Sequence, residues 1–76
     1  MAQPIFTNKA LYQMKQLELS ESSVLNAYNT GTYEKGTYSD LAIKKYPGSE
    51  IGVAYIKDKL SGNYIITSVW VRNNRR

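Results

Sequence analysis

The 76-residue sequence contains no cysteine and no histidine. Without these side chains the protein has no disulfide, no thiol nucleophile, no imidazole base and no zinc site of the usual kind. Most familiar enzyme mechanisms are excluded with them, and we expect neither a metal nor another cofactor. A glycine-rich phosphate loop is also missing, because the five glycines are scattered along the chain.

Long apolar runs and a secretion signal are missing as well. The N-terminal residues do not combine a basic region with a long apolar stretch, and Pro4 interrupts them. The longest purely apolar run is far shorter than the ~20 residues of a membrane-spanning helix. We therefore expect a soluble, cytoplasmic protein of a bacterium, phage or plasmid, without a membrane partner.

The composition is that of one small globular domain that covers residues 1–76, with 42% hydrophobic and 21% charged residues. Residues 1–38 contain three Lys and three Glu, whereas residues 39–76 contain seven Lys or Arg and three acidic residues. The whole net charge of +4 therefore belongs to the C-terminal half. Such a half attracts RNA or an acidic protein partner, and a merely solubilising surface is the alternative.

Two helices are predicted in the first half of the chain. Thr7 and Ser20 are good N-caps, because a hydroxyl accepts a hydrogen bond from an unpaired backbone N–H of the first turn. An apolar residue precedes each cap and another follows it at the N4 position, as in a hydrophobic staple. We expect the second helix to end at Gly31 in a left-handed cap.

The second half alternates apolar and polar side chains, as strands do. The predicted strands cover residues 41–46, 51–56 and 64–71, and residues 32–38 are a candidate for an additional edge strand. Short connections favour antiparallel hairpins. The sequence thus predicts an α+β fold with two N-terminal helices packed on a three- or four-stranded antiparallel β-meander. The predicted core residues are Met14, Leu17, Val24, Leu25, Ile43, Val53, Ile66 and Val69.

Basic and aromatic side chains occur together toward the C-terminus. Arginine suits phosphate, because its guanidinium group offers five donors in a fixed fork. The tyrosines of the polar segment 32–38 are the exposed candidates among seven in the chain, whereas strand tyrosines more often pack on the sheet. A frayed tail is the structural alternative for the last residues. The candidate binding residues are Lys44, Lys45, Lys57, Trp70, Arg72, Arg75 and Arg76, with Tyr33 and Tyr38 as exposed anchors.

Two segments follow a known pattern. Residues 7–24 match Thr-x-His-Ala-x-x-Arg-Met-x-x-Arg-Gly-Ile-Ser-x-x-x-Val at Thr7, Ala10, Met14, Leu19, Ser20 and Val24. Residues 65–70, Ile-Ile-Thr-Ser-Val-Trp, match a closing strand of the type Ile-Thr-Val-Tyr-Trp. In these positions the chain resembles the domain-of-unknown-function family 4258, which looks related to the BrnT and RelE type toxins of toxin–antitoxin systems. The resemblance implies a single RelE/BrnT-like domain over residues 1–76.

The resemblance also implies a reaction, because toxins of this class cleave RNA by promoting attack of a ribose 2′-hydroxyl on the neighbouring phosphate. That reaction needs a proton acceptor, a proton donor and a cation. Lys9 stands where the family has His, and Gln13 and Leu17 stand where it has Arg. Lys9 and Arg72 remain as candidate catalytic residues, but no general base accompanies them. This departure favours binding over catalysis.

We therefore expect a non-catalytic macromolecule-binding module of toxin–antitoxin or mobile-element type. It would bind RNA or an acidic protein partner through its basic C-terminal half. Two alternatives stay open, namely an endoribonuclease toxin that uses Lys9, Arg72 and a tyrosine, and a purely protein-binding inhibitor or assembly module. The sequence also leaves a homodimer open.

Overall fold

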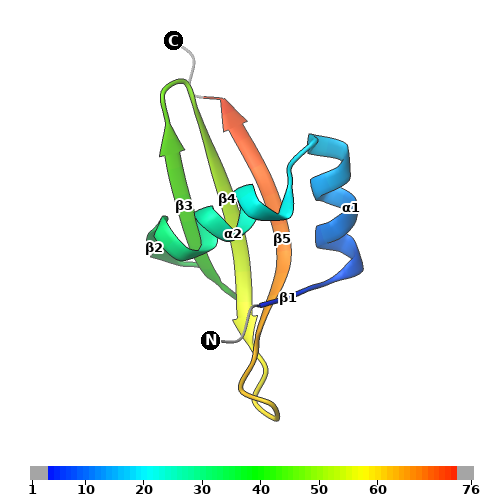
Figure 1. The fold of residues 1–76 in the computed structure, drawn as a ribbon. Helices are drawn as coiled ribbons and strands as arrows, with labels where there is room; N and C mark the ends of the chain where they lie inside the picture. Colours follow the sequence, from blue (N-terminus) through cyan, green and yellow to red (C-terminus); the bar gives the residue numbers. More distant parts are fainter. Residues whose placement is uncertain (1–3, 74–76) are drawn as a thin grey trace.

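The computed structural model describes residues 4–73, which form two helices and one five-stranded sheet (Figure 1). The strand order across the sheet is β1-β5-β4-β3-β2, and all neighbouring strands are antiparallel except β1 and β5. The predicted α+β class, the two helices and the additional edge strand, β2, are confirmed. The elements are β1 (Ile5–Phe6), α1 (Asn8–Leu17), α2 (Glu21–Thr30), β2 (Thr32–Lys35), β3 (Asp40–Tyr46), β4 (Ser49–Lys57) and β5 (Tyr64–Asn73).

The prediction of a purely antiparallel sheet of three or four strands is wrong, because β1 adds a fifth strand that runs parallel to β5. Ile5 pairs with Ile65, and Phe6 pairs with Ile66. The Thr7 amide continues this pairing by donating to the Ile66 carbonyl oxygen at 3.1 Å. Two residues are too few to show an alternation, and their partners lie in the last strand of the chain. No local pattern therefore indicates this strand.

Both predicted helix N-caps are confirmed. The Thr7 hydroxyl accepts a hydrogen bond from the Ala10 amide at 3.1 Å, and the Ser20 hydroxyl accepts one from the Ser23 amide at 3.1 Å. Each bond satisfies one of the backbone donors that the first turn of a helix leaves unpaired. The caps thereby fix where α1 and α2 begin.

The second helix ends where predicted, with Gly31 as its C-cap, but the conformation of this cap differs from the prediction. α1 ends at Leu17, and its C-cap, Glu18, has a left-handed backbone with φ 58°. The predicted left-handed cap at Gly31 is wrong, since this residue is extended with φ −71°. Glycine is required there for space, because a Cβ at position 31 would lie 2.9 Å from the backbone carbon of Ile43. Gly31 thus allows the chain to pass from α2 into β2 directly beside β3.

Both helices pack on one face of the sheet and bury their apolar side chains there (Figure 1). Six of the eight predicted core residues are buried. The prediction for Leu17 is wrong, because this residue lies at the far end of α1 and has 39% of its surface exposed. Leu25 is half-buried. Ile43 is buried, but outside the core that the helices cover. That core contains Ala10, Met14, Val24, Ala27, Ile51, Val53, Ile66 and Val69.

Candidate functional site

The opposite face of the sheet has no described element packed on it (Figure 1). Cross-strand partners share a face, so the strand register assigns the residues of this surface. We call it the helix-free face. Its side chains form three rows of cross-strand neighbours, namely Ile43, Gly52 and Trp70, then Leu41, Ala54 and Ser68, then Ile56, Ile65 and Ile5.

The indole ring of Trp70 lies directly on the backbone of β4 at Gly52. A Cβ at position 52 would overlap three atoms of the indole ring. Gly52 is therefore required for space and not for an unusual backbone conformation. The ring is half-buried, and its neighbour Ile43 in the same row is buried. Gly52 thus holds a large aromatic surface close to the sheet in the middle of the helix-free face.

The remaining apolar side chains of this face are open to solvent to different degrees. Ile5 has 50% of its surface exposed and Ile56 has 38%, whereas Leu41 and Ile65 are half-buried. These residues continue the apolar surface from Trp70 toward the lower end of the sheet in Figure 1. Contiguous apolar surface with an aromatic centre is typical of protein interfaces.

A row of charged residues lies beyond Trp70, toward the upper end of the sheet. In the strand register, Glu50 of β4 lies opposite Lys45 of β3 on one side and opposite Arg72 of β5 on the other. Arg72 Nη1 lies 3.7 Å from Glu50 Oε2, and the two side chains are 68% and 10% exposed. The carboxylate is thus enclosed while the guanidinium group extends into solvent. With Glu34 of β2, which is also exposed, the formal charges of this end of the face cancel.

A shallow cavity of about 200 Å³ lies where the charged row meets the Trp70 row. Leu41, Ile43 and Trp70 line it with apolar groups, while the four charged side chains line it with polar ones. The cavity gives the helix-free face a depression in which an apolar group and an ionic group of a partner fit side by side. We take this face as the candidate functional site.

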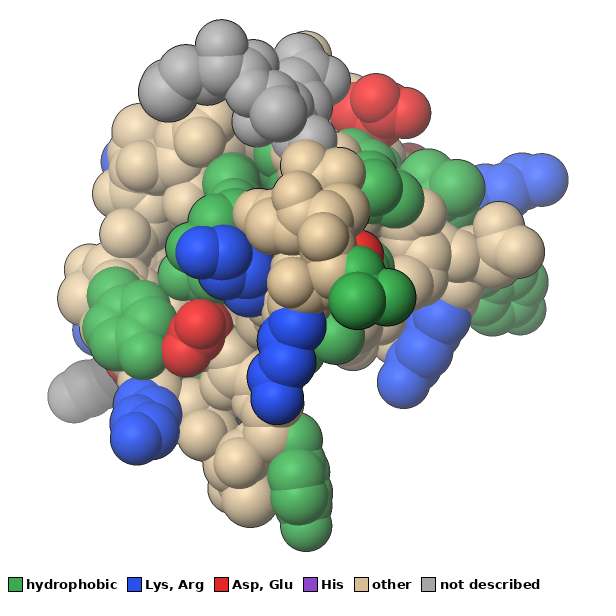
Figure 2. Space-filling model, turned by 90° about the horizontal axis from the view of Figure 1, so that it is seen from below, with side chains coloured by type: hydrophobic (Ala, Val, Ile, Leu, Met, Phe, Trp, Pro, Cys, Tyr) green, Lys and Arg blue, Asp and Glu red, His purple; other side chains and the backbone are tan. Residues whose placement is uncertain are grey.

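The opposite end of the sheet has a second cavity, of about 300 Å³, beside the connection between β2 and β3. Tyr38 and Lys57 are among the residues that line it, and Tyr38 is 94% exposed. Lys57 Nζ lies 5.9 Å from the centre of the Tyr64 ring. Figure 2 is the view from this end and shows Lys or Arg side chains standing apart around projecting hydrophobic ones. The cations here are dispersed and do not line one groove.

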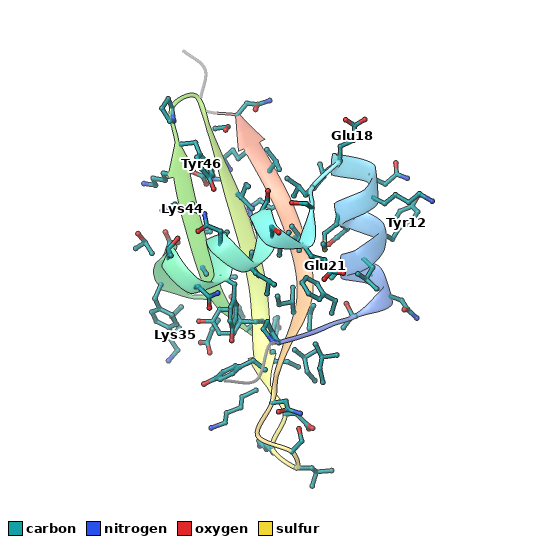
Figure 3. The ribbon with its side chains drawn as sticks, in the orientation of Figure 1. Tyr12, Glu18, Glu21, Lys35, Lys44 and Tyr46 are labelled. Carbon is teal, nitrogen blue, oxygen red and sulfur yellow. The ribbon has the colours of Figure 1, made fainter. Side chains whose placement is uncertain are left out.

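The predicted binding residues fall into separate places. Lys45, Trp70 and Arg72 share the helix-free face. Lys44 is on the helix side of the upper part of β3 (Figure 3), because successive residues of a strand point to opposite faces. Lys57 is at the opposite end of the sheet, at the end of β4. Arg75 and Arg76 lie outside the described residues.

The two candidate catalytic residues are far apart. Lys9 lies in the first turn of α1, two residues after Thr7, whose hydroxyl donates to the Thr67 carbonyl oxygen. Arg72 follows Thr67 by five residues along β5, which is about 17 Å of strand. Lys9 and Arg72 therefore cannot act together on one phosphate group.

Tyr28, Tyr33 and Tyr55 do not provide the missing general base. Burial and the neighbouring phenols raise the pKa of Tyr28, and burial and the Asp40 carboxylate raise that of Tyr55. The Tyr33 hydroxyl donates to Asp40 Oδ1 at 2.8 Å, and this hydrogen bond raises the pKa of Tyr33. All three phenols therefore keep their protons at neutral pH. A protonated phenol does not accept the proton of a ribose hydroxyl.

Sequence reasoning missed Gly52, Glu50 and the aliphatic residues of the helix-free face. Part of this surface could have been predicted from the sequence. A two-residue turn at Pro47-Gly48 pairs Tyr46 with Ser49 and thereby fixes the register of β3 and β4. The register of β5 against β4 could not be predicted from the sequence. A bulge interrupts its pairing with β4 after Ala54, and a six-residue connection, residues 58–63, precedes it.

Comparison with known proteins adds no relative, since no family model, no curated protein and no solved structure matches the chain. Neither of the described helices has the length and hydropathy needed to cross a membrane. Within residues 4–73, no group of acidic side chains could hold a metal ion. The geometry of the helix-free face is therefore the basis for a functional assignment.

Proposed function

We propose that this protein is a non-catalytic binding module that docks a protein partner on its helix-free face. The observation that carries the proposal is the Trp70 indole, which lies on Gly52 at the upper end of an apolar surface that no described element covers. Tryptophan and arginine are the side chains that most often dominate the binding energy of protein interfaces. Both occur here, with an enclosed carboxylate between Arg72 and Lys45.

The charge distribution favours a protein over RNA at this face. Nucleic-acid binding depends on cations that neutralise several phosphates in succession. Here Glu50 separates Lys45 from Arg72, and Glu34 adds a second negative charge. Lys45 and Arg72 are nevertheless both exposed beside the enclosed Glu50. They suit one or two acidic side chains of a protein partner rather than a polyanion.

The order of elements supports a relationship to the RelE/BrnT-like family as part of this proposal. Two capped helices precede an antiparallel meander, and residues 65–70 lie in its last strand, β5. A toxin–antitoxin or mobile-element setting in the cytoplasm follows from that resemblance. The separation of Lys9 from Arg72 and the lack of a general base favour binding over RNA cleavage within it.

Peptide selection tests the proposal directly. Random peptides displayed on phage are selected on the folded protein, and bound peptides are located by NMR shifts of ¹⁵N-labelled protein. We expect the selected peptides to combine apolar and acidic residues and to shift the signals of Gly52, Ala54 and the Trp70 indole N–H. Trp70→Ala should lose this binding, whereas Tyr12→Ala, on the outward side of α1 (Figure 3), should keep it.

RNA provides the opposing outcome of the same test. Single-stranded RNA that shifts the same signals, with an affinity that falls steeply with salt, would overturn the proposal in favour of RNA binding. Cleavage of RNA by the unmodified protein, with or without ribosomes, would overturn its non-catalytic part.

A further inference from the structure

We infer that the occupant of the helix-free face is a single amphipathic α-helix of an acidic partner. It would lie along β4 with its acidic end at Lys45 and Arg72. This inference rests on the proposed protein-binding function and specifies the form of the partner. The dimensions of the apolar surface, its charge at one end only, and the poor fit of the described helices of a second copy carry the argument.

The width of the apolar surface fits one helix. Each row extends over three neighbouring strands, which is two strand spacings, or about 10 Å. The first two rows lie on β3, β4 and β5, and the third lies on β4, β5 and β1. An α-helix with its side chains is about 10–12 Å wide. A partner sheet would need a broader apolar area, and β2 adds only the charged Glu34 and the hydroxyl of Thr32 to this side. One helix therefore covers the apolar rows without burying Glu34.

The length of the surface fits two to three helical turns. Gly52 and Ile56 mark the first and last apolar rows on β4, four residues or about 13 Å apart. A helix covers that length with about nine residues. Apolar side chains at positions i, i+4 and i+7 of the partner would then meet the three rows in turn. The first of them would reach the cavity beside Trp70.

The charged row sets the direction of the helix. The row that contains Lys45 and Arg72 lies only at the upper end, while Ile5, Ile56 and Ile65 form the opposite end. An acidic side chain one turn beyond the apolar anchors would therefore meet the two exposed cations. The reverse orientation would place that carboxylate on isoleucine and remove it from water without a partner.

A second copy of this chain is a poorer occupant. Each copy carries a net charge of +4, so two copies repel each other at low salt. The helices of a second copy are poor occupants, because Ala10 and Met14 in α1 and Val24 and Ala27 in α2 are already buried in its core. The exposed apolar residues of α1, namely Leu11, Tyr12 and Leu17, do not follow the i, i+4, i+7 spacing that the three rows require. The face therefore suits a different protein.

Synthetic peptides test the inference on the intact protein. The probe is a capped helical peptide with leucines at i, i+4 and i+7 and two glutamates in the turn beyond the first leucine. Two comparison peptides carry lysines in place of the glutamates, or a proline in the middle that breaks the helix. Trp70 is the only tryptophan of the chain, so its fluorescence reports occupation of the face directly. We expect the glutamate peptide to bind at least tenfold more tightly than either comparison peptide.

Adjacent lysines provide a matched pair of variants. Lys45 faces the site and Lys44 faces the helix side. Lys45→Glu should weaken binding of the glutamate peptide at least tenfold and strengthen binding of the lysine peptide, whereas Lys44→Glu should change neither. Equal effects of the two variants would overturn the orientation. The thermal unfolding of both variants is measured alongside, so that a loss of folding is recognised.

The outcomes distinguish a failure of this inference from a failure of the proposed protein-binding function. Equal binding of the proline peptide at the helix-free face would overturn the helical form of the partner and leave protein binding intact. If no peptide, including those selected from a random library, changes Trp70 fluorescence or the signals of Gly52 and Ala54, the helix and the protein-binding function both fail. A second copy that occupies the face would appear as a dimer in sedimentation and would overturn the inference as well.

Discussion

The side chain of Gln13 closes the free edge of β5 by accepting a hydrogen bond from the Val69 amide, with Oε1 2.7 Å from that nitrogen. The same oxygen accepts the Ser68 hydroxyl at 3.2 Å. β1 is only two residues long and pairs with Ile65 and Ile66, so the edge of β5 beyond it would otherwise present an unpaired donor. Exposed strand edges invite pairing with other chains, and one glutamine blocks this one.

Replacing Gln13 by alanine should therefore leave the partly buried Val69 amide without its acceptor. We expect Gln13→Ala to lower the free energy of unfolding by about 1–3 kcal/mol, since an unsatisfied buried donor costs its full desolvation. The exchange of the Val69 amide proton should accelerate in the same variant. Gln16→Ala, at an exposed position of the same helix, is the control and should change neither quantity. An unaltered exchange rate at Val69 would contradict the role of Gln13.

Met14 and Leu17 test the orientation of α1. Met14 is buried, whereas Leu17 is 39% exposed, although both belong to the apolar pattern of the helix. Met14→Ala should cost about 2–5 kcal/mol of stability in urea unfolding, because it leaves a cavity in the core. Leu17→Ala should cost clearly less. Equal losses would mean that α1 is rotated about its axis relative to the structure described here.

The fold was predictable wherever a local signal determined it. The hydroxyls of Thr7 and Ser20 marked the starts of the helices, and the turn at Pro47-Gly48 marked a hairpin. Leu17 shows what helical periodicity cannot predict. The spacing identifies the apolar side of a helix, but it does not show how much of that side the sheet covers. β1 was not predictable, since its two residues pair with a strand at the other end of the chain.

The candidate site was predictable only in part, for a related reason. Lys45, Trp70 and Arg72 were chosen by residue type, and the structure brings them to one face. The choice could not show that Glu50 separates the two cations or that Gly52 receives the indole ring. Both facts depend on the register of β5 against β4, which a bulge and a six-residue connection obscure.

Ser20 provides a test of the joint between the helices. Its hydroxyl accepts a hydrogen bond from the Ser23 amide at 3.1 Å and fixes the start of α2 after a connection of three residues. Ser20→Ala should lower the free energy of unfolding by about 0.5–2 kcal/mol, as the loss of an N-cap does. Ser22→Ala, in the exposed first turn, is the matched control. A melting curve of Ser20→Ala that coincides with that of the unmodified protein would count against the cap.

Stability should also fall at alkaline pH because of three tyrosines that pack together between α2 and the sheet. The rings of Tyr28, Tyr55 and Tyr64 contact one another edge to face, with centres 5.0 to 6.4 Å apart. Burial is the main cause that raises the pKa of Tyr28 and Tyr55 above its ordinary value of 10.0. The folded state therefore holds these protons more tightly than the unfolded state does.

The stabilisation linked to these protons is complete below pH 10 and is lost as the pH rises through the higher pKa values of the folded state. We expect the free energy of unfolding in urea to be level from about pH 8 to about pH 9 and to decline above about pH 10. Tyr28→Phe combined with Tyr55→Phe removes two of the titrating hydroxyls and should make the decline shallower. An equally steep decline in this double variant would show that the alkaline loss of stability arises elsewhere in the chain.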